Sequence, residues 1–223
     1  MTTRGTATPS PSTNTPPLVG RPRGFDADRA LERAMLLFWR HGYEGATLTG
    51  LTTAMGISRT SMYAAYGNKR QLFALALARY ADTVMAYAGR ALAAPAAREV
   101  AETFLRENVR VVTARDRPLG CFSLQGGLAC GPDNTAVSTT LARSRQAGER
   151  AMRDRFRRAA DEGDSVPGIS PDDLARYIMI VSEGLAVHAA AGSTVEDLAR
   201  VVDIALRALP EETSRRPRRP ESG

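Results

Sequence analysis

From residue 25 to residue 210 the sequence repeats one signal: a capping residue, a helical stripe of apolar side chains, and then glycine or proline. The predicted helix starts are Asp26, Thr47, Ser58, Asn68, Ser170 and Thr194. No alternating strand pattern interrupts this order. The sequence therefore predicts an all-α protein of about nine helices.

Helix ends are as readable as the starts. Gly42, Gly56 and Gly67 close the first three predicted helices, and a long helix is expected from Lys69 to about Ala93. The further ranges predicted as helix are about 95–115, 119–130, 134–162, 171–192 and 194–209. Residues 1–20 and 211–223 lack such signals and are predicted to be disordered tails, the second of them basic.

The segment Thr47–Tyr66 predicts two short helices joined by a glycine turn. Gly56 suits the left-handed backbone of a tight helix end, and Ser58 caps the second helix. Polar side chains then fill the first positions of that second helix. In a helix-turn-helix these positions face base edges in the major groove, although an ordinary helical hairpin has the same spacing.

Charge favours the DNA-binding reading. The chain has a formal net charge of +6, and residues 21–70 carry eight basic and four acidic side chains. Arg21 and Arg23 precede the first helix as an arm suited to a DNA backbone or minor groove. Lys69, the only lysine, opens a helix where the macrodipole disfavours a cation by a few tenths of a kcal/mol. A bound phosphate explains its place there.

Residues 20–73 resemble the DNA-binding head of the TetR family of regulators. The resemblance rests on Gly42-Tyr43, on Ala54-Met55-Gly56-Ile57-Ser58 at the turn, on Met62-Tyr63, and on Asn68-Lys69 with Leu72-Phe73. It implies that Tyr63 and Lys69 contact phosphates, and that an all-α, Ω-like homodimer binds an inducer in its larger domain. The predicted DNA-binding residues are Arg21, Arg23, Thr47, Thr49, Arg59, Thr60, Ser61, Tyr63, Tyr66 and Lys69.

The expected organisation is a DNA-binding head at 21–70 and a ligand-binding and dimerisation domain at 71–210. Two heptad stripes mark the last two helices and predict a four-helix bundle between two copies. The predicted interface residues are Leu174, Ile178, Val181, Leu185, His188, Val195, Leu198, Val202, Ala205 and Leu209. The same stripes would also suit the core of a single chain.

The middle of the larger domain is the expected sensor. The predicted lining residues are Phe104, Asn108, Cys121, Phe122, Gln125, Met152 and Phe156, each of which also suits an ordinary core. Cys121 and Cys130 lie nine residues apart, on opposite sides of an unbroken helix, which disfavours a disulfide between them. The two histidines give no metal-ligand pattern.

These observations favour a cytoplasmic, ligand-responsive repressor with a palindromic double-stranded operator and a small-molecule inducer. No cofactor, metal or membrane partner is expected. A thiol- or metal-responsive regulator acting through Cys121 and Cys130, and a constitutive DNA-binding protein, remain alternatives. An enzyme is disfavoured, because the sequence has no nucleophile motif and no glycine-rich phosphate loop.

Overall fold

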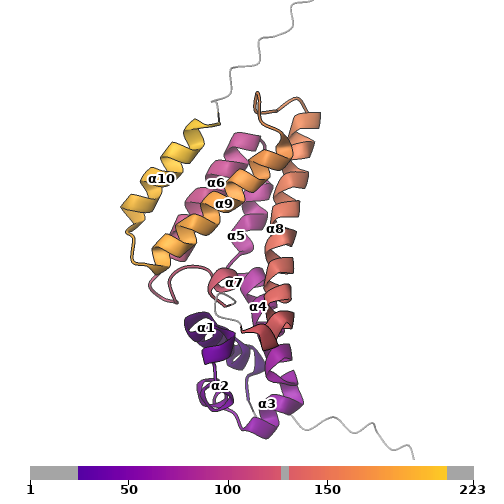
Figure 1. The fold of residues 1–223 in the computed structure, drawn as a ribbon, viewed down its shortest axis with the longest axis vertical. Coiled ribbons are helices and arrows are strands. Elements are labelled where there is room, and N and C mark those ends of the chain that lie inside the picture. Colours follow the sequence, from indigo (N-terminus) through magenta and orange to yellow (C-terminus); the bar gives the residue numbers. More distant parts are fainter. Residues whose placement is uncertain (1–24, 127–130, 210–223) are drawn as a thin grey trace, which may run out of the picture.

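The computed structural model describes residues 25–126 and 131–209, and within these ranges its regular secondary structure is all helical. The described residues form ten α-helices and one short 3₁₀ helix, with no strand, which confirms the all-α prediction. The first three helices form a head at one end, and a taller helical bundle rises from it (Figure 1). None of the helices described combines the length and the apolar character needed to cross a membrane.

The head comprises α1 (Ala27–Gly45), α2 (Leu48–Met55) and α3 (Arg59–Tyr66), and α4 (Lys69–Thr83) leads into the body. Each helix starts where the sequence predicts it, with a capping side chain that accepts a hydrogen bond from the backbone N–H of the third residue of the helix. The capping residues are Asp26, Thr47, Ser58 and Asn68. Asn68 and Gln71 complete a capping box at the start of α4.

The regular backbone of α1 breaks at Gly42, which has φ 68° and ψ 176°. The sequence predicts that the helix ends here, whereas one further turn follows as far as Gly45. An added Cβ at Gly42 would lie 3.7 Å from the carbonyl oxygen of Gln125. Glycine thus supplies both a left-handed conformation and a close approach between α1 and a distant segment.

The single helix predicted from Lys69 to about Ala93 is two helices in the structure, α4 and α5 (Ala86–Leu92). At the break, the carbonyl oxygen of Tyr80 accepts hydrogen bonds from both Val84 N and Met85 N. No proline or glycine lies at this position, so the helix stop signals in the sequence do not predict the break. It accounts for ten helices rather than about nine.

The remaining elements build the body. They are α6 (Ala97–Val112), α7 (Phe122–Gln125), the 3₁₀ helix η1 (Pro132–Asn134), α8 (Thr135–Asp161), α9 (Pro171–Ala190) and α10 (Val195–Arg207). The predicted helix 119–130 is reduced to α7 within the described part of that range, while residues 127–130 lie outside it. α8 runs along one side from the top of the body down to the head, and α10 lies at the opposite edge (Figure 1).

Polar side chains tie the ends of the body helices together. Ala96, at the start of α6, supplies no side-chain cap, and Asp164 beyond α8 takes that role by accepting a 2.6 Å hydrogen bond from Ala97 N. The buried guanidinium of Arg155 donates to the carbonyl oxygens of Ala94 and Pro95. Helix-end groups are thus satisfied by side chains distant in sequence.

We expect Asp164→Ala to lower the free energy of unfolding by about 1 kcal/mol, because α6 loses its N-terminal cap. Urea unfolding followed by circular dichroism measures this change. Asp161→Ala, at the exposed end of α8, is the matched control and should leave the midpoint nearly unchanged. Equal midpoints for the two variants would show that the Asp164 contact contributes nothing to stability.

Candidate functional site

The helix-turn-helix predicted from the sequence is present in α2 and α3. Gly56 adopts φ 69° and ψ 33°, the left-handed conformation expected at the turn, and its backbone N–H closes α2. The Ser58 hydroxyl accepts from Ser61 N and lies 2.9 Å from the Ser61 hydroxyl. The second helix therefore begins at a fixed point, with its first turn turned outwards.

The outward face of α3 carries polar and aromatic side chains. Arg59, Thr60 and Tyr63 are exposed, and Tyr63 has 45% of its surface open to solvent. The Ser61 hydroxyl is engaged at the helix start, so Ser61 is less free to contact a ligand. Arginine, threonine and tyrosine side chains contact the phosphates and base edges of DNA. Their exposure together on α3 therefore favours a DNA-binding surface over an ordinary solvent-facing helix.

Tyr66 was predicted to bind DNA, and the structure corrects this interpretation. It is 8% exposed, and its phenol donates a 2.7 Å hydrogen bond to the carbonyl oxygen of Ala27. Tyr66 stands four residues after the buried Met62, so both residues share the inner face of a short helix. Tyr66 fastens α3 to the start of α1 and is not available at the outer surface.

The other residues predicted to bind DNA also include some with a structural role and some on the outer surface. Thr47 uses its hydroxyl to cap α2, accepting from Gly50 N at 3.0 Å, while Thr49 in the first turn of α2 is exposed. Arg21 and Arg23 lie outside the described residues. Thr49 therefore adds to the outward surface of the head, and Thr47 primarily fixes the start of α2.

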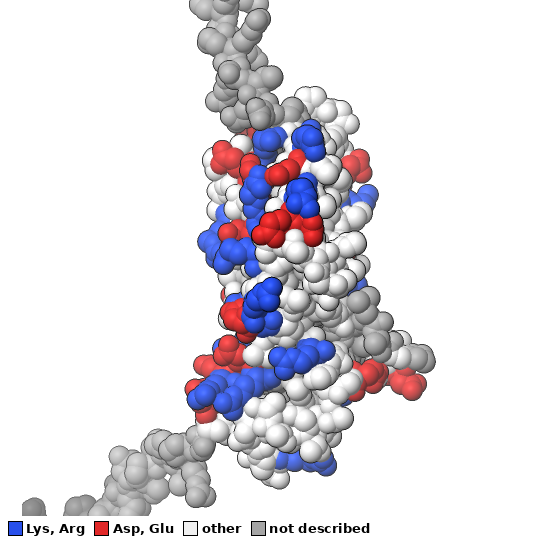
Figure 2. Space-filling model, turned by 90° about the vertical axis from the view of Figure 1, so that its left-hand side faces the viewer, with Lys and Arg blue, Asp and Glu red and all other residues white. Residues whose placement is uncertain are grey.

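A basic helix end lies next to α3. Lys69 and Arg70 open α4, which has no acidic residue in its first turn, and the Lys69 Nζ lies 4.4 Å from the centre of the Tyr43 ring. Figure 2 shows a basic patch at the lower tip of the molecule, where the head lies, and side chains of both signs above it. Cations at the positive end of a helix dipole form a place for an anion.

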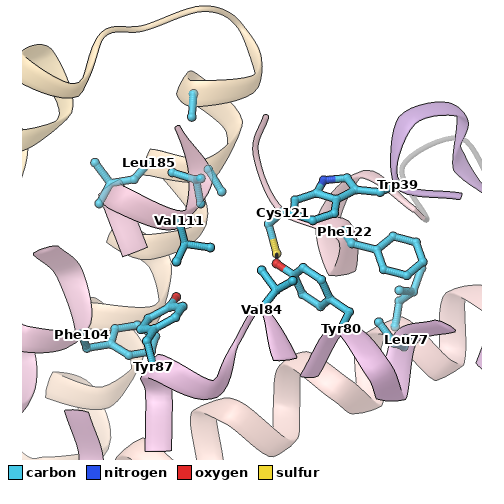
Figure 3. Close-up of a cluster of buried hydrophobic side chains, with 14 of the residues drawn as sticks. Trp39, Leu77, Tyr80, Val84, Tyr87, Phe104, Val111, Cys121, Phe122 and Leu185 are labelled. Carbon is cyan, nitrogen blue, oxygen red and sulfur yellow. Dashed lines mark hydrogen bonds between the residues drawn. The ribbon is translucent and has the colours of Figure 1, made fainter. Parts of the chain in front are cut away.

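Three of the residues predicted to line a sensor, Phe104, Cys121 and Phe122, are buried in two neighbouring clusters (Figure 3). In one, the Phe104 ring lies 5.5 Å from the Tyr87 ring, and Asn108 Nδ2 donates a 2.9 Å hydrogen bond to the Tyr87 hydroxyl. The Asn108 Oδ1 is buried and accepts no hydrogen bond within the described residues. This oxygen is a polar group for which a ligand donor would supply the missing partner.

The second cluster surrounds Cys121 and Phe122. The Tyr80 hydroxyl donates to Cys121 Sγ at 3.2 Å, and the Ser123 hydroxyl lies 3.0 Å from the same sulfur. Burial raises the pKa of Tyr80 and the pKa of Tyr87 well above the ordinary value, so both phenols remain protonated. Cys130 lies outside the described residues.

Met152 and Phe156 are buried on α8, and Gln125 is half-buried beside Trp39. Three open grooves on the described surface have volumes of about 390, 450 and 630 Å³, and none of the predicted lining residues forms their walls. The predicted sensor residues thus come together as packed core. A ligand among them would have to displace side chains.

The heptad stripes of α9 and α10 lie mostly inside the chain, which corrects the predicted interface. The stripe residues that the chain itself buries are Leu174, Ile178, Leu185, Leu198, Val202, Ala205 and Leu209. Val181 is half-buried, and only His188 and Val195 are exposed. The pattern shows which face is apolar, but one chain's own α6, α8 and α9 already cover that face.

A different apolar set faces outwards from the same two helices. Its members, which sequence periodicity missed, are Tyr177, Ile180 and Val187 on α9 and Val201 and Ile204 on α10. Ile180 and Ile204 are 61% and 59% exposed. Large aliphatic side chains gathered on neighbouring helices are typical of a surface that another protein covers.

Comparisons with known proteins agree with this geometry. A family model described as "Bacterial regulatory proteins, tetR family" matches residues 30–76. The transcriptional repressor ComR of Escherichia coli is 30% identical over 205 residues, which cover 86% of this chain and 92% of ComR. The uncharacterised regulator YezE of Bacillus subtilis is 29% identical over 194 residues, covering 86% of this chain and all of YezE.

Solved structures extend the likeness to the whole fold. A cysteine-substituted form of the TetR family regulator CifR, complexed with 26-bp operator DNA, is 42% identical, with a TM-score of 0.81. The match covers 86% of this chain and 100% of CifR. A putative TetR regulator from Rhodococcus sp. RHA1 is 38% identical, with a TM-score of 0.56, and the match covers 83% of this chain and all of that one.

We expect Tyr66→Phe to lower the free energy of unfolding by about 1 kcal/mol, because the buried bond to the Ala27 carbonyl is lost. Tyr63→Phe removes the same hydroxyl from an exposed ring and should leave stability unchanged. Thermal unfolding of the two variants beside the unmodified protein makes the comparison. A destabilised Tyr63→Phe with an unaffected Tyr66→Phe would reverse the assignment of the two tyrosines.

Proposed function

This chain belongs to the TetR family of bacterial regulatory proteins, and from that premise we propose that it is a ligand-responsive transcriptional repressor. In this proposal a cytoplasmic homodimer binds a palindromic operator through a head at residues 21–70. A small molecule bound in a body at residues 71–210 then releases it. The observation that carries the proposal is the exposed start of α3, with Arg59, Thr60 and Tyr63 beside the basic end of α4.

The head supplies two kinds of DNA contact. Arg59 and Thr60, in the first turn of α3, reach base edges when that helix lies in the major groove. Lys69, at the N-terminus of α4, holds a phosphate together with the backbone N–H groups of that helix end. A relative of this chain has been captured on 26-bp operator DNA, which supports the same partner here.

The dimer supplies the spacing. Two recognition helices must enter successive major grooves about 34–36 Å apart, which a pair of chains related by a two-fold axis achieves on a palindrome. The exposed apolar face of α9 and α10 is the surface that we assign to this pairing. Pairing through Ile180, Val187 and Ile204 would remove from water the side chains that the folded chain leaves open.

The body supplies the response. An inducer bound near Tyr87 and Asn108 would meet an aromatic wall and a carbonyl oxygen in need of a donor. Binding there favours an arrangement of the body in which the two heads no longer fit the operator. We assign Cys121, which is 9% exposed and hydrogen-bonded on both sides, to packing within this core.

Lys69→Ala should weaken binding to all DNA sequences alike and lower the dependence of log K on log salt by about one unit. Fluorescence anisotropy with labelled DNA at several salt concentrations measures the slope. The operator is first obtained by selection from random duplexes. Lys69→Arg is the control, because it keeps the charge at the helix end.

Arg59→Ala provides the contrasting change, since a base contact affects sequence preference. Its loss should cost about 1–3 kcal/mol on the selected operator and less on unrelated DNA. An unchanged salt slope in Lys69→Ala, or unchanged site preference in Arg59→Ala, would remove that residue from the proposed interface.

Ile204→Glu should convert the dimer into a folded monomer, because a carboxylate cannot be buried unpaired against a partner. Sedimentation equilibrium measures the mass, and anisotropy should show much weaker operator binding. Leu198→Ala is the control: it should destabilise the core by about 2–5 kcal/mol and leave the dimer intact. A dimeric Ile204→Glu would place the interface on another face.

A further inference from the structure

The segment Gly120–Gly126, which we call the α7 clasp, is fixed to the body at one end. Gly120 N donates a 2.8 Å hydrogen bond to the Val112 carbonyl at the end of α6. A Cβ at Gly120 would lie 3.0 Å from the Ala186 carbonyl of α9, so the clasp passes directly against that helix. Arg145 of α8 donates to the Ser123 carbonyl at 2.9 Å.

Within the clasp, the side chains of Cys121 and Phe122 enter the part of the buried core that adjoins the proposed inducer site near Tyr87 and Asn108. Figure 3 shows both converging on Tyr80 and Trp39. The Phe122 ring lies 5.7 Å from the ring of Tyr80 and 6.5 Å from that of Trp39. A rearrangement of this core therefore acts on the clasp without passing through another element.

The other end of the clasp is bonded to the head. The Trp39 indole Nε1 donates a 2.9 Å hydrogen bond to Gln125 Oε1, and Tyr43 N donates to the Gly126 carbonyl at 3.3 Å. Both donors lie on the last turns of α1, on either side of the break at Gly42. These contacts join residues more than 80 positions apart in sequence.

The clasp also bears on the proposed phosphate contact. Tyr43, whose backbone bonds to Gly126, holds its ring 4.4 Å from the Lys69 Nζ. A cation lying over an aromatic face is attracted by the ring quadrupole, so the position of the ring biases the position of the ammonium group. The orientation of the α1 end thus affects where Lys69 stands.

We infer that the α7 clasp couples the body to the head, with Gln125 as a positioning residue that holds α1 through Trp39. The inference rests on the proposed function and names the route by which the body regulates the DNA-binding head. α4 also links the two parts, but its helix stops at Thr83, before α5 begins at Ala86. The clasp is a second and shorter connection, made by side chains that the core itself contacts.

We call the clasp closed when it is bonded both to the body and to the head, as it is here. Whether opening it raises or lowers operator affinity depends on which arrangement of head and body has the closed clasp. This chain matches an operator-bound CifR chain over 86% of its length with a TM-score of 0.81. On the basis of this likeness to an operator-bound chain, we assign the closed clasp to the arrangement that binds DNA. Opening it should lower operator affinity, by about tenfold for a coupling of ordinary size.

The test compares three glutamine variants on the selected operator. Gln125→Leu removes the acceptor for Trp39 and should weaken binding about tenfold, within the range of ordinary couplings. Gln125→Glu keeps an acceptor oxygen and should recover most of the affinity. Gln146→Leu makes the same substitution on the exposed surface of α8 and should bind as the unmodified protein does. Trp39 is the only tryptophan, so its single indole N–H resonance reports directly whether the bond is lost.

A second measurement separates coupling from local structure. Because coupling is reciprocal, operator binding should slow hydrogen exchange in the peptide 119–126 of the unmodified protein, and this protection should disappear in Gln125→Leu. Full operator affinity in a Gln125→Leu variant with a shifted indole resonance would overturn the inference. So would unchanged exchange in the unmodified protein on DNA, even if the variant failed to fold. An unmodified protein that selects no DNA would instead refute the proposed function.

Discussion

The structure depends on one network of aromatic rings that spans the junction of head and body. Aromatic residues make up only 6% of the chain, yet six of them form a continuous series of ring contacts. The members are Phe38, Trp39, Tyr43, Phe73, Tyr80 and Phe122. Edge-to-face pairs of this kind stabilise by about 0.5–1.5 kcal/mol beyond the area they bury. The network packs α1, α4 and α7 against one another. The orientation of the head therefore depends on how the core of the body is packed.

Local features of the fold were predictable because their causes are local. A cap depends on a side chain and a backbone N–H a few residues away, and Asp26, Ser58 and Asn68 are therefore found where the sequence placed them. The left-handed turn at Gly56 follows the same logic. The break between α4 and α5 does not. The Tyr80 carbonyl oxygen accepts two hydrogen bonds at that point, and no residue type there predicts a break in the helix.

The candidate site was less predictable, because tertiary contacts decide which of its side chains are exposed. Tyr63 and Tyr66 are three positions apart on one short helix, and only the position of α1 decides that Tyr66 is buried. Heptad spacing likewise shows that α9 and α10 have an apolar face but not what covers it. Leu198 and Val202 turned out to be covered by the chain itself. Ile180 and Ile204 lie outside the heptad stripes, on the faces of α9 and α10 that would otherwise be polar. An isoleucine in this position on each of two consecutive helices was the available signal for the outer apolar surface.

That outward face has a consequence for how the protein behaves at different concentrations. A single folded chain exposes Ile180, Val187, Val201 and Ile204 to water, and each loses the favourable free energy that burial would provide. If pairing covers them, association and folding draw on the same free energy. The melting temperature then rises with the amount of protein, and the number of molecules in a cell sets how much of the chain is folded as well as how much of the operator is occupied.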